Sequence, residues 1–325
     1  MPSLSPAVAE IRRAVRPVLA DRAGERVIVA LSGGADSLAL TAATAHEAAK
    51  AGVSVTTVTV DHGLQDGSAD IAERAAAQAR ALAVDAIVVT ATVERNHEDG
   101  PEAAAREARY AELERVAADL GATAILLGHT RDDQAETVLL GLARGSGAAS
   151  LMGMAPSSGL RVRPLLDVSR ETTQAACAAE NLEPWHDPHN VDPSYARVRV
   201  RTTVLPTLET ELGPGIAEAL ARTAEQLRED HDAFQEIIDE TIEDIVEPAE
   251  AGIAISVSAL AANPAALRNR IIRYVVASEF HVSLTRVQTL EVARFATDWR
   301  GQGPIDLPGC EARREAGKIV ISARA

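Results

Sequence analysis

The chain has 325 residues, of which 46% are apolar and 24% are charged, and its formal net charge is −15. This length exceeds what one compact core usually holds, so we expect two domains. No apolar run approaches the roughly 20 residues that a membrane helix needs, so we predict no membrane-bound part. The two cysteines, Cys177 and Cys310, are far apart and form no CxxC pair. That usage fits a reducing, cytoplasmic compartment and argues against a disulfide framework, a zinc ribbon or an iron–sulfur centre.

The negative charge is concentrated in one segment. Residues 216–250 hold twelve acidic and two basic residues and therefore carry −10 of the total of −15. The rest of the chain is close to neutral. The net charge therefore does not exclude an RNA partner; it predicts that one acidic helix face points away from it.

Strands and helices are expected to alternate through the first 142 residues. An amphipathic helix near the N-terminus precedes them. The predicted strands are 27–31, 53–60, 86–93 and 122–128, and the predicted helices are 38–51, 70–83, 102–120 and 133–142. Because these strands are continuous apolar runs, we predict an α/β fold with a doubly wound, mostly parallel, Rossmann-like sheet covered on both faces.

The pattern changes after residue 147. A loop at 156–164, a helix at 169–181 and a proline-rich stretch at 184–193 are expected next. Pro206 and Gly213-Pro214 indicate a boundary, which gives a first domain at 1–210 and a second at 215–325. For the second, smaller and mainly helical domain we predict a long amphipathic helix at 215–247, helices at about 264–280 and 284–298, and a hairpin-like end at 305–322.

The first candidate site is the loop between the strand at 27–31 and the helix at 38–51. In an open parallel sheet, ligands bind at the carboxyl ends of strands, where a helix N-terminus offers free N–H groups to phosphate. Two adjacent glycines let the backbone approach phosphate oxygens, and two serines add hydroxyl donors. The loop lacks the Gly-Lys-Ser/Thr ending of a Walker A loop, so a kinase or GTPase is not predicted. The predicted nucleotide-binding residues are Ser32, Gly33, Gly34, Ala35, Asp36 and Ser37.

A carboxylate is unexpected in an anion site. Asp36 fits if Mg²⁺ accompanies the phosphates, because a hard cation prefers carboxylate oxygens. The competing interpretation is that Ser and Asp here only cap a helix. Asp61 and His62 end the second strand at the same edge of the sheet and join the predicted nucleotide site, although an Asp before a Gly turn is also common without a ligand.

A third polar segment, residues 128–137, follows the fourth strand and opens a helix. Asp133 and Glu136 are three residues apart and share one face of the first helical turn. Two carboxylates there can hold an ammonium group or a metal, and one could accept a proton. Helix-dipole compensation is the competing explanation, and it is favoured for Asp132. His129 could orient a neighbour or simply pack.

Three groups of arginines stand out in this acidic chain. Two of them, the trios at 197–201 and 268–273, have no nearby acid and suggest phosphate contacts, although each trio alone could be a solvated face. Aromatic residues make up 2% of the chain, which argues against a base-stacking platform. The groups are Arg106 and Arg109; Arg197, Arg199 and Arg201; and Arg268, Arg270 and Arg273.

In order and spacing, these segments resemble the tRNA(Ile)-lysidine synthetase family of PP-loop ATP pyrophosphatases, in its short form. The resemblance covers roughly residues 25–210, and the helical C-terminal domain is of similar length to the family's first accessory domain. The matching segments are SGGADS at 32–37, VDHGL at 60–64, EAAAREARY at 102–110, GHTRDDQAET at 128–137, RGSG at 144–147, RPLL at 163–166, and WHDPHN followed by Arg197, Arg201 and Pro206.

The resemblance implies a two-step ligation. ATP with Mg²⁺ adenylates the carbonyl oxygen at carbon 2 of the wobble cytidine of tRNA(Ile) with a CAU anticodon, and free L-lysine then displaces AMP. In this scheme Asp36 holds the metal, Asp133 and Glu136, with His129, bind lysine, and Arg106 and Arg109 stabilise phosphate charge. The other two arginine groups contact tRNA. The oligomeric state stays open, a homodimer included.

Two positions depart from the family pattern. Gln65 replaces an arginine, and Val198 replaces an asparagine whose hydrogen bond is then missing or rerouted. Other hypotheses are a related PP-loop enzyme, such as a tRNA thiolase or an amidotransferase-type synthetase, and a non-catalytic ATP- or RNA-binding module. The thiolase would need reactive cysteines, and neither cysteine adjoins a matching segment.

Overall fold

The computed structural model describes residues 4–63, 67–92, 101–145, 147–249 and 252–324. The chain forms two compact units, Met1–Leu227 and Arg228–Ala325. The division lies inside the helix α10 (Ile216–Ile245) and therefore beyond the boundary expected at residues 210–215. The first turn of α10 packs with Val200 and Leu205 of the first unit, whereas its last turns enter the core of the second.

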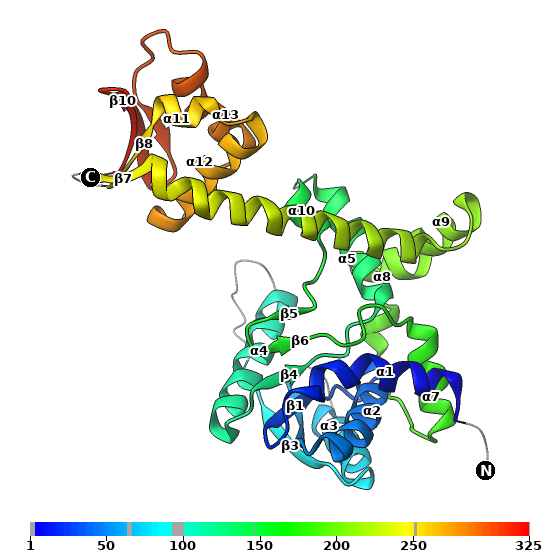
Figure 1. Cartoon of the computed structure of the whole chain (residues 1–325). Helices are drawn as coiled ribbons and strands as arrows, with labels where there is room; N and C mark the ends of the chain where they lie inside the picture. Colours follow the sequence, from blue (N-terminus) through cyan, green and yellow to red (C-terminus); the bar gives the residue numbers. More distant parts are fainter. Residues whose placement is uncertain (1–3, 64–66, 93–100, 146, 250–251, 325) are drawn as a thin grey trace. The chain divides into compact units, whose positions relative to one another are not determined.

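The first unit is built on a six-stranded sheet with the order β3-β2-β1-β4-β6-β5. All neighbours are parallel except β5 and β6, so the predicted α/β, mostly parallel fold is confirmed (Figure 1). The strands are β1 (Arg26–Ala30), β2 (Ser54–Asp61), β3 (Asp85–Thr90), β4 (Ala124–Leu126), β5 (Ser157–Ser158) and β6 (Arg161–Val162). The loop expected at 156–164 thus contains two strands, each too short to produce a periodic pattern.

Helices cover both faces of this sheet because β1 is apolar on both sides. Val27 and Val29 belong to a core with α1, α2, α3 and α7, whereas Ile28 belongs to a second core with α4. These helices are α1 (Pro6–Ala20), α2 (Ala35–Ala51), α3 (Ser68–Ala81), α4 (Pro101–Leu120) and α7 (Arg170–Ala179). Burial on both faces explains why the strands are continuous apolar runs.

The remaining elements of the first unit are short. They are α5 (Arg131–Arg144), α6 (Ala148–Leu151), the 3₁₀ turn η1 (Pro188–Val191), α8 (Ala196–Arg199), the π-helical turn η2 (Val200–Val204) and α9 (Leu205–Leu212). Because β1, β2, β4 and β6 are parallel, the segments that follow them meet at one edge of the sheet. The predicted site segments at 32–37, 61–62 and 128–137 all follow these strands.

The second unit contains a five-stranded antiparallel sheet with the order β7-β8-β11-β10-β9. Helices still make up more of this unit than strands do, as expected, but the strands β7 and β8 were not predicted. The elements are β7 (Val246–Ala249), β8 (Gly252–Ser256), α11 (Val257–Ala262), α12 (Ala265–Phe280), α13 (Arg286–Thr297), β9 (Ile305–Leu307), β10 (Cys310–Glu315) and β11 (Lys318–Ala323). The hairpin expected at 305–322 is confirmed. The pairing of β8 with β11 joins segments more than 60 residues apart, which no local pattern reports.

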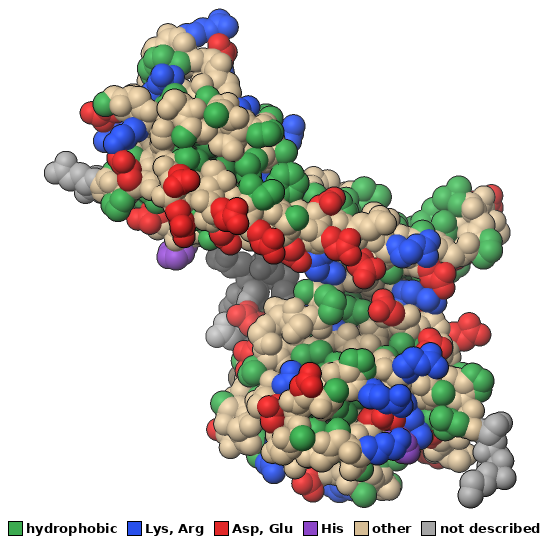
Figure 2. All heavy atoms as spheres, viewed as in Figure 1, with side chains coloured by type: hydrophobic (Ala, Val, Ile, Leu, Met, Phe, Trp, Pro, Cys, Tyr) green, Lys and Arg blue, Asp and Glu red, His purple; other side chains and the backbone are tan. Residues whose placement is uncertain are grey.

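Acidic side chains gather along α10, as predicted from the charge distribution (Figure 2). The opposite face of its C-terminal half supplies Ile238 and Ile245 to the core of the second unit. Across the part of the chain that the structure describes, no helix has both the length and the hydropathy to cross a membrane.

Candidate active site

The loop after β1 is held in a fixed shape by its own serines and by a distant segment. The Ser32 N–H donates to Ser37 Oγ at 3.2 Å, and Ser37 Oγ donates to the Gly34 carbonyl at 3.0 Å. The Trp185 N–H donates to the Gly33 carbonyl at 2.9 Å, which ties the WHDPHN segment to this loop. Gly33 has φ +84°, a conformation that glycine adopts without strain.

The helix α2 begins without a side-chain cap. Its N-cap residue is Gly34, which has no side chain to cap the helix, and among the described residues no side chain is bonded to the N–H groups of Ala35, Asp36 or Ser37. The interpretation of Ser32 and Asp36 as helix caps is therefore wrong for this loop. Gly128 lies close against the same turn, because a Cβ there would stand 3.1 Å from backbone atoms of Asp36 and Ser37. The result is a set of N–H donors without side-chain caps at a positive helix end, which suits an anion such as pyrophosphate.

Asp36 lies in the first turn of α2, partly buried, with an unusual titration. Thr173 of α7 donates a hydrogen bond to Asp36 Oδ1. Burial raises the pKa of Asp36 to about 6, the hydrogen bond from Thr173 opposes this, and the negative charge of Asp133 adds to it. A nearby cation would stabilise the ionised form of a carboxyl group whose pKa is raised in this way. Among the residues that the structure describes, no three acidic, His or Cys side chains converge on one point. Mg²⁺ would therefore be held by Asp36 together with phosphate oxygens, as is usual for this ion.

The aspartates at the start of α5 form hydrogen bonds that stabilise the fold. Asp133 Oδ2 accepts from the Thr130 N–H at 2.9 Å and from Thr130 Oγ1 at 3.0 Å, which forms a capping box. Asp132 Oδ2 accepts from the Arg170 N–H at 2.8 Å and so joins α5 to the start of α7. Both oxygens of Asp132 thus face Arg170, whose Nη1 lies 3.9 Å from Oδ1, and this contact between helices accounts for Asp132. Helix capping accounts for only one of the two oxygens of Asp133.

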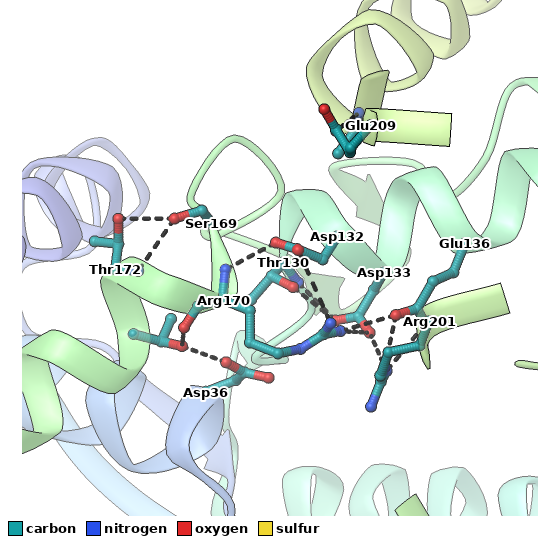
Figure 3. Close-up of polar contacts among 12 residues, drawn as sticks. Asp36, Thr130, Asp132, Asp133, Glu136, Ser169, Arg170, Thr172, Arg201 and Glu209 are labelled. Carbon is teal, nitrogen blue, oxygen red and sulfur yellow. Dashed lines mark hydrogen bonds and ion pairs between the residues drawn. The ribbon is translucent and has the colours of Figure 1, made fainter. Parts of the chain in front are cut away.

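The other oxygen of Asp133 and both oxygens of Glu136 face arginines (Figure 3). Arg170 Nη2 lies 3.0 Å from Asp133 Oδ1 and 3.1 Å from Glu136 Oε1. Arg201 Nε lies 2.7 Å from Glu136 Oε1, and its Nη2 lies 3.2 Å from Asp133 Oδ1. Arg197 Nε lies 3.1 Å from Glu136 Oε2. Because Glu136 is fully buried, these cations offset the cost of its charge.

This network corrects one expectation from the sequence. Arg197 and Arg201 have no acid beside them in the chain, yet the fold places both on Glu136. Arg199 donates to two backbone carbonyls at 2.7 Å. Burial opposes ionisation of Asp133, but Arg170 and the Thr130 N–H together hold its pKa below the ordinary value. Asp133 therefore ionises at a lower pH than Asp36, whose pKa is raised to about 6.

Two histidines at the same sheet edge have lowered pKa values, which favours their neutral forms. Arg109 Nε donates to His62 Nε2 at 3.2 Å, and burial followed by the Arg109 charge lowers the pKa of His62. Burial lowers the pKa of His129 to about 4, and the charges of Arg163, Arg106 and Arg197 contribute while Asp133 opposes them. Asp61 Oδ1 accepts from the Gly63 N–H at 2.9 Å, which is the ordinary turn contact of an Asp before Gly. Arg106 stands over the ring of Tyr110.

Comparison with known proteins agrees with this geometry. The family model of a PP-loop domain matches residues 7–208, and that of a TilS substrate binding domain matches residues 255–320. The tRNA(Ile)-lysidine synthase of Leifsonia xyli subsp. xyli is 56% identical over 92% of this chain and 90% of its own length. That of Thermobifida fusca is 50% identical over 98% of both chains.

The chain belongs to the tRNA(Ile)-lysidine synthase family. Among solved structures, the U34-tRNA thiolase NcsA from Methanococcus maripaludis with its [4Fe-4S] cluster has a TM-score of 0.58 at 20% identity, covering 69% of this chain and 80% of that one. At that identity the similarity shows the fold alone. In this lysidine synthase family member, both cysteines are buried, and burial raises the pKa of Cys177 to about 12.

The C-terminal arginine trio differs from the expected open cluster. Arg268 Nη1 donates to the Asn263 carbonyl at 3.0 Å, and Arg270 stacks 4.1 Å from the ring centroid of Phe234. Arg273 is exposed. Only one member of the trio thus presents its side chain freely to solvent.

Sequence reasoning missed three site residues. Arg170 and Thr173 have no local signal, because each acts across the fold on α5 or α2. Arg163 stands in the RPLL segment that carried the family resemblance, although no role was assigned to it. Of the two departures from the family pattern, Gln65 lies outside the described residues, as does Leu64 beside it. Val198 is 7% exposed, so an apolar side chain fits there, and Arg197 bonds Thr137 Oγ1 at 2.8 Å.

Proposed function

We propose that this chain ligates lysine to carbon 2 of the wobble cytidine of tRNA(Ile) with a CAU anticodon, at the expense of ATP. The cytidine carbonyl oxygen attacks the α-phosphorus and pyrophosphate leaves. The ε-amine of lysine then attacks carbon 2, loses a proton and displaces AMP. Family membership supports the reaction, and the uncapped start of α2 beside a glycine pair is the observation that carries the ATP step.

Residues after β1 would bind the pyrophosphate portion of ATP. The N–H groups of α2 are donors at a positive helix end, and the hydroxyls of Ser32 and Ser37, which are bonded to each other, lie in the same loop. Asp36 would hold Mg²⁺, which when bound neutralises phosphate charge. Arg109, which is exposed and rests on His62, and Arg106 are available to phosphate oxygens at the same sheet edge.

Asp133 and Glu136 would bind the ammonium groups of lysine, next to His129. Their oxygens are bonded to Arg170 and Arg201, so lysine has to compete with a guanidinium. Arg201 is the group that we propose to withdraw, because it lies on the π-helical turn η2. Such turns are irregular and frequent at functional sites. Once released, Arg201 could join Arg197 and Arg199 in contacting tRNA phosphates. In the second unit, the exposed Arg273 is a separate candidate for such a contact.

The direct test is incubation of the purified protein with ATP, labelled lysine and tRNA(Ile) bearing CAU. We expect label on the RNA with equal release of AMP, and no label on a tRNA with a GAU anticodon. Asp36→Ala should abolish pyrophosphate release, whereas Asp133→Ala should mainly raise the KM for lysine. Folded protein that releases no AMP and labels no tRNA would refute the proposal, and equal defects of both variants in both steps would refute this division of roles.

A further inference from the structure

Arg163 is a buried cation without a counter-charge among the residues that the structure describes. It directly follows β6, and the residue is only 8% exposed. Its Nη1 donates to the Ala155 carbonyl at 2.7 Å, and its Nε is buried without any hydrogen-bond partner. Over the described part of the chain, no carboxylate forms an ion pair with it. An unpaired buried charge is costly and is retained mainly where function needs it.

The groups around Arg163 are themselves positive. The guanidinium carbons of Arg161 and Arg106 lie 4.1 Å and 5.4 Å from the ring centroid of Tyr110. Burial lowers the pKa of Arg163, and the charges of Arg106 and Arg161 lower it further. Arg161 has a partner in Glu114 at 2.7 Å, but no described acid is positioned to offset Arg163. The positive charge of Arg163 in the group formed by Arg106, Arg161 and Arg163 is therefore not compensated by a described acid.

A partly buried histidine lies near Arg163. His129 follows β4, the neighbour of β6, and its Nδ1 is buried without a partner. The charges of Arg163 and Arg106 act on its ring and help to keep it neutral. Two unpartnered polar atoms thus lie at the sheet edge that also carries the ATP loop. Their chemistry, an arginine and an imidazole N–H, suits a phosphate oxygen.

We propose that Arg163, with His129 beside it, binds a backbone phosphate of the tRNA next to the wobble cytidine. The assignment of the bound anion to tRNA rests on the proposed function. The existence of an anion subsite at Arg163 does not depend on that function. A phosphate of ATP is the other source of the same chemistry. Strand order favours RNA, because β6 is two strands from β1, about 10 Å along the sheet edge from the loop that would hold pyrophosphate.

The test compares Arg163→Met with Arg115→Met, a matched control on α4 whose guanidinium is paired with Glu112 and Asp119. Binding of tRNA(Ile) is measured across a salt series, and ATP binding is measured separately. For Arg163→Met we expect roughly tenfold weaker tRNA binding and a salt slope smaller by about 0.7, one phosphate contact of the single-stranded type. ATP affinity should not change. The control should leave all three values unaltered.

The melting temperature distinguishes this role from a structural one. Because methionine removes an uncompensated buried charge, Arg163→Met should melt at the same or a higher temperature than the wild type. A markedly lower melting temperature with an unchanged salt slope would overturn the proposal. So would a loss of ATP affinity with normal tRNA binding, which would assign the subsite to the nucleotide.

A second measurement does not depend on the variant's folding. Wild-type protein is titrated with tRNAs carrying one neutral methylphosphonate, placed 5′ or 3′ of the wobble cytidine. One of these should bind about tenfold more weakly, and Arg163→Lys should be less sensitive to that replacement than the wild type. If neither replacement weakens binding, the proposal fails. Lysine incorporation is scored separately, so RNA binding through Arg163 without lysidine formation would refute the function and leave the subsite standing.

Discussion

Replacing Asp36 by Asn should stabilise the protein at neutral pH while it removes activity. The pKa of Asp36 is raised from 3.8 to about 6, so the folded state binds more protons than the unfolded state between these values. The stability that the wild type gains from protonated Asp36 is therefore lost as pH rises from about 4 to 6. A difference of about 2 in pKa corresponds to about 3 kcal/mol, which is an upper bound because the side chain is only partly buried.

Asparagine keeps the shape of Asp36 and can still accept the hydrogen bond from Thr173. In calorimetry without ATP and Mg²⁺, the unit Met1–Leu227 of Asp36→Asn should melt up to about 6–12 °C above the wild type at pH 8. The difference should vanish near pH 4. An unchanged or lower melting temperature at pH 8, or an equal gain at pH 4 and pH 8, would refute the argument that burial and Asp133 destabilise the charged form.

The same titration should govern activity in the wild type. Activity should rise with pH through about 6 at low Mg²⁺, since the metal needs the ionised carboxylate of Asp36. Higher Mg²⁺ should move this rise to lower pH, because a bound cation lowers the pKa. Thr173→Val removes the hydrogen bond that lowers this pKa and should move the rise to higher pH. A pH profile insensitive to both changes would show that another group titrates.

Three further predictions address other parts of the site. Glu136→Gln leaves three guanidinium groups facing a buried neutral amide and should cost about 3–5 kcal/mol of stability, seen as a lower melting temperature; a loss under about 1 kcal/mol would mean that the arginines are solvated. Gly128→Ala would push a Cβ into the start of α2 and should weaken ATP binding roughly tenfold, whereas Gly303→Ala, which meets open space, should not; equal affinities would mean that the loop adapts. Replacing Cys177 and Cys310 together by Ala should keep lysine incorporation within about twofold, because buried thiols are inert; abolished incorporation in folded protein would instead favour chemistry of the thiolase type.

The sequence was informative wherever a signal is local. Strands buried on both faces are apolar along their whole length, so β1 and β2 were predicted to within a few residues. The long helix at 215–247 was found because its apolar spacing is regular, and the structure places it at Ile216–Ile245. The glycine pair at 33–34 was recognisable because only glycine combines a positive φ with close approach of an anion.

Signals that depend on distant partners were missed or misjudged. The strands β5 and β6 have two residues each and exist only through pairing with their neighbours. The acid-free arginines of 197–201 were expected on an open face, yet Glu136, more than 60 residues earlier, pairs with two of them. The strands β7 and β8 of the second unit were not predicted because they are defined by a partner strand near the end of the chain.

The sequence by itself thus determined the parallel α/β sheet, the glycine loop at a strand end and the resemblance to a family, because these depend on residues adjacent in the chain. Only the tertiary structure decided which charges are compensated. It joined Glu136 to its three arginines, gave Asp36 a raised pKa and left Arg163 buried without an acid among the described residues. The physical reason is that burial and the distance between charges set these energies, and both arise only when segments far apart in the chain pack together.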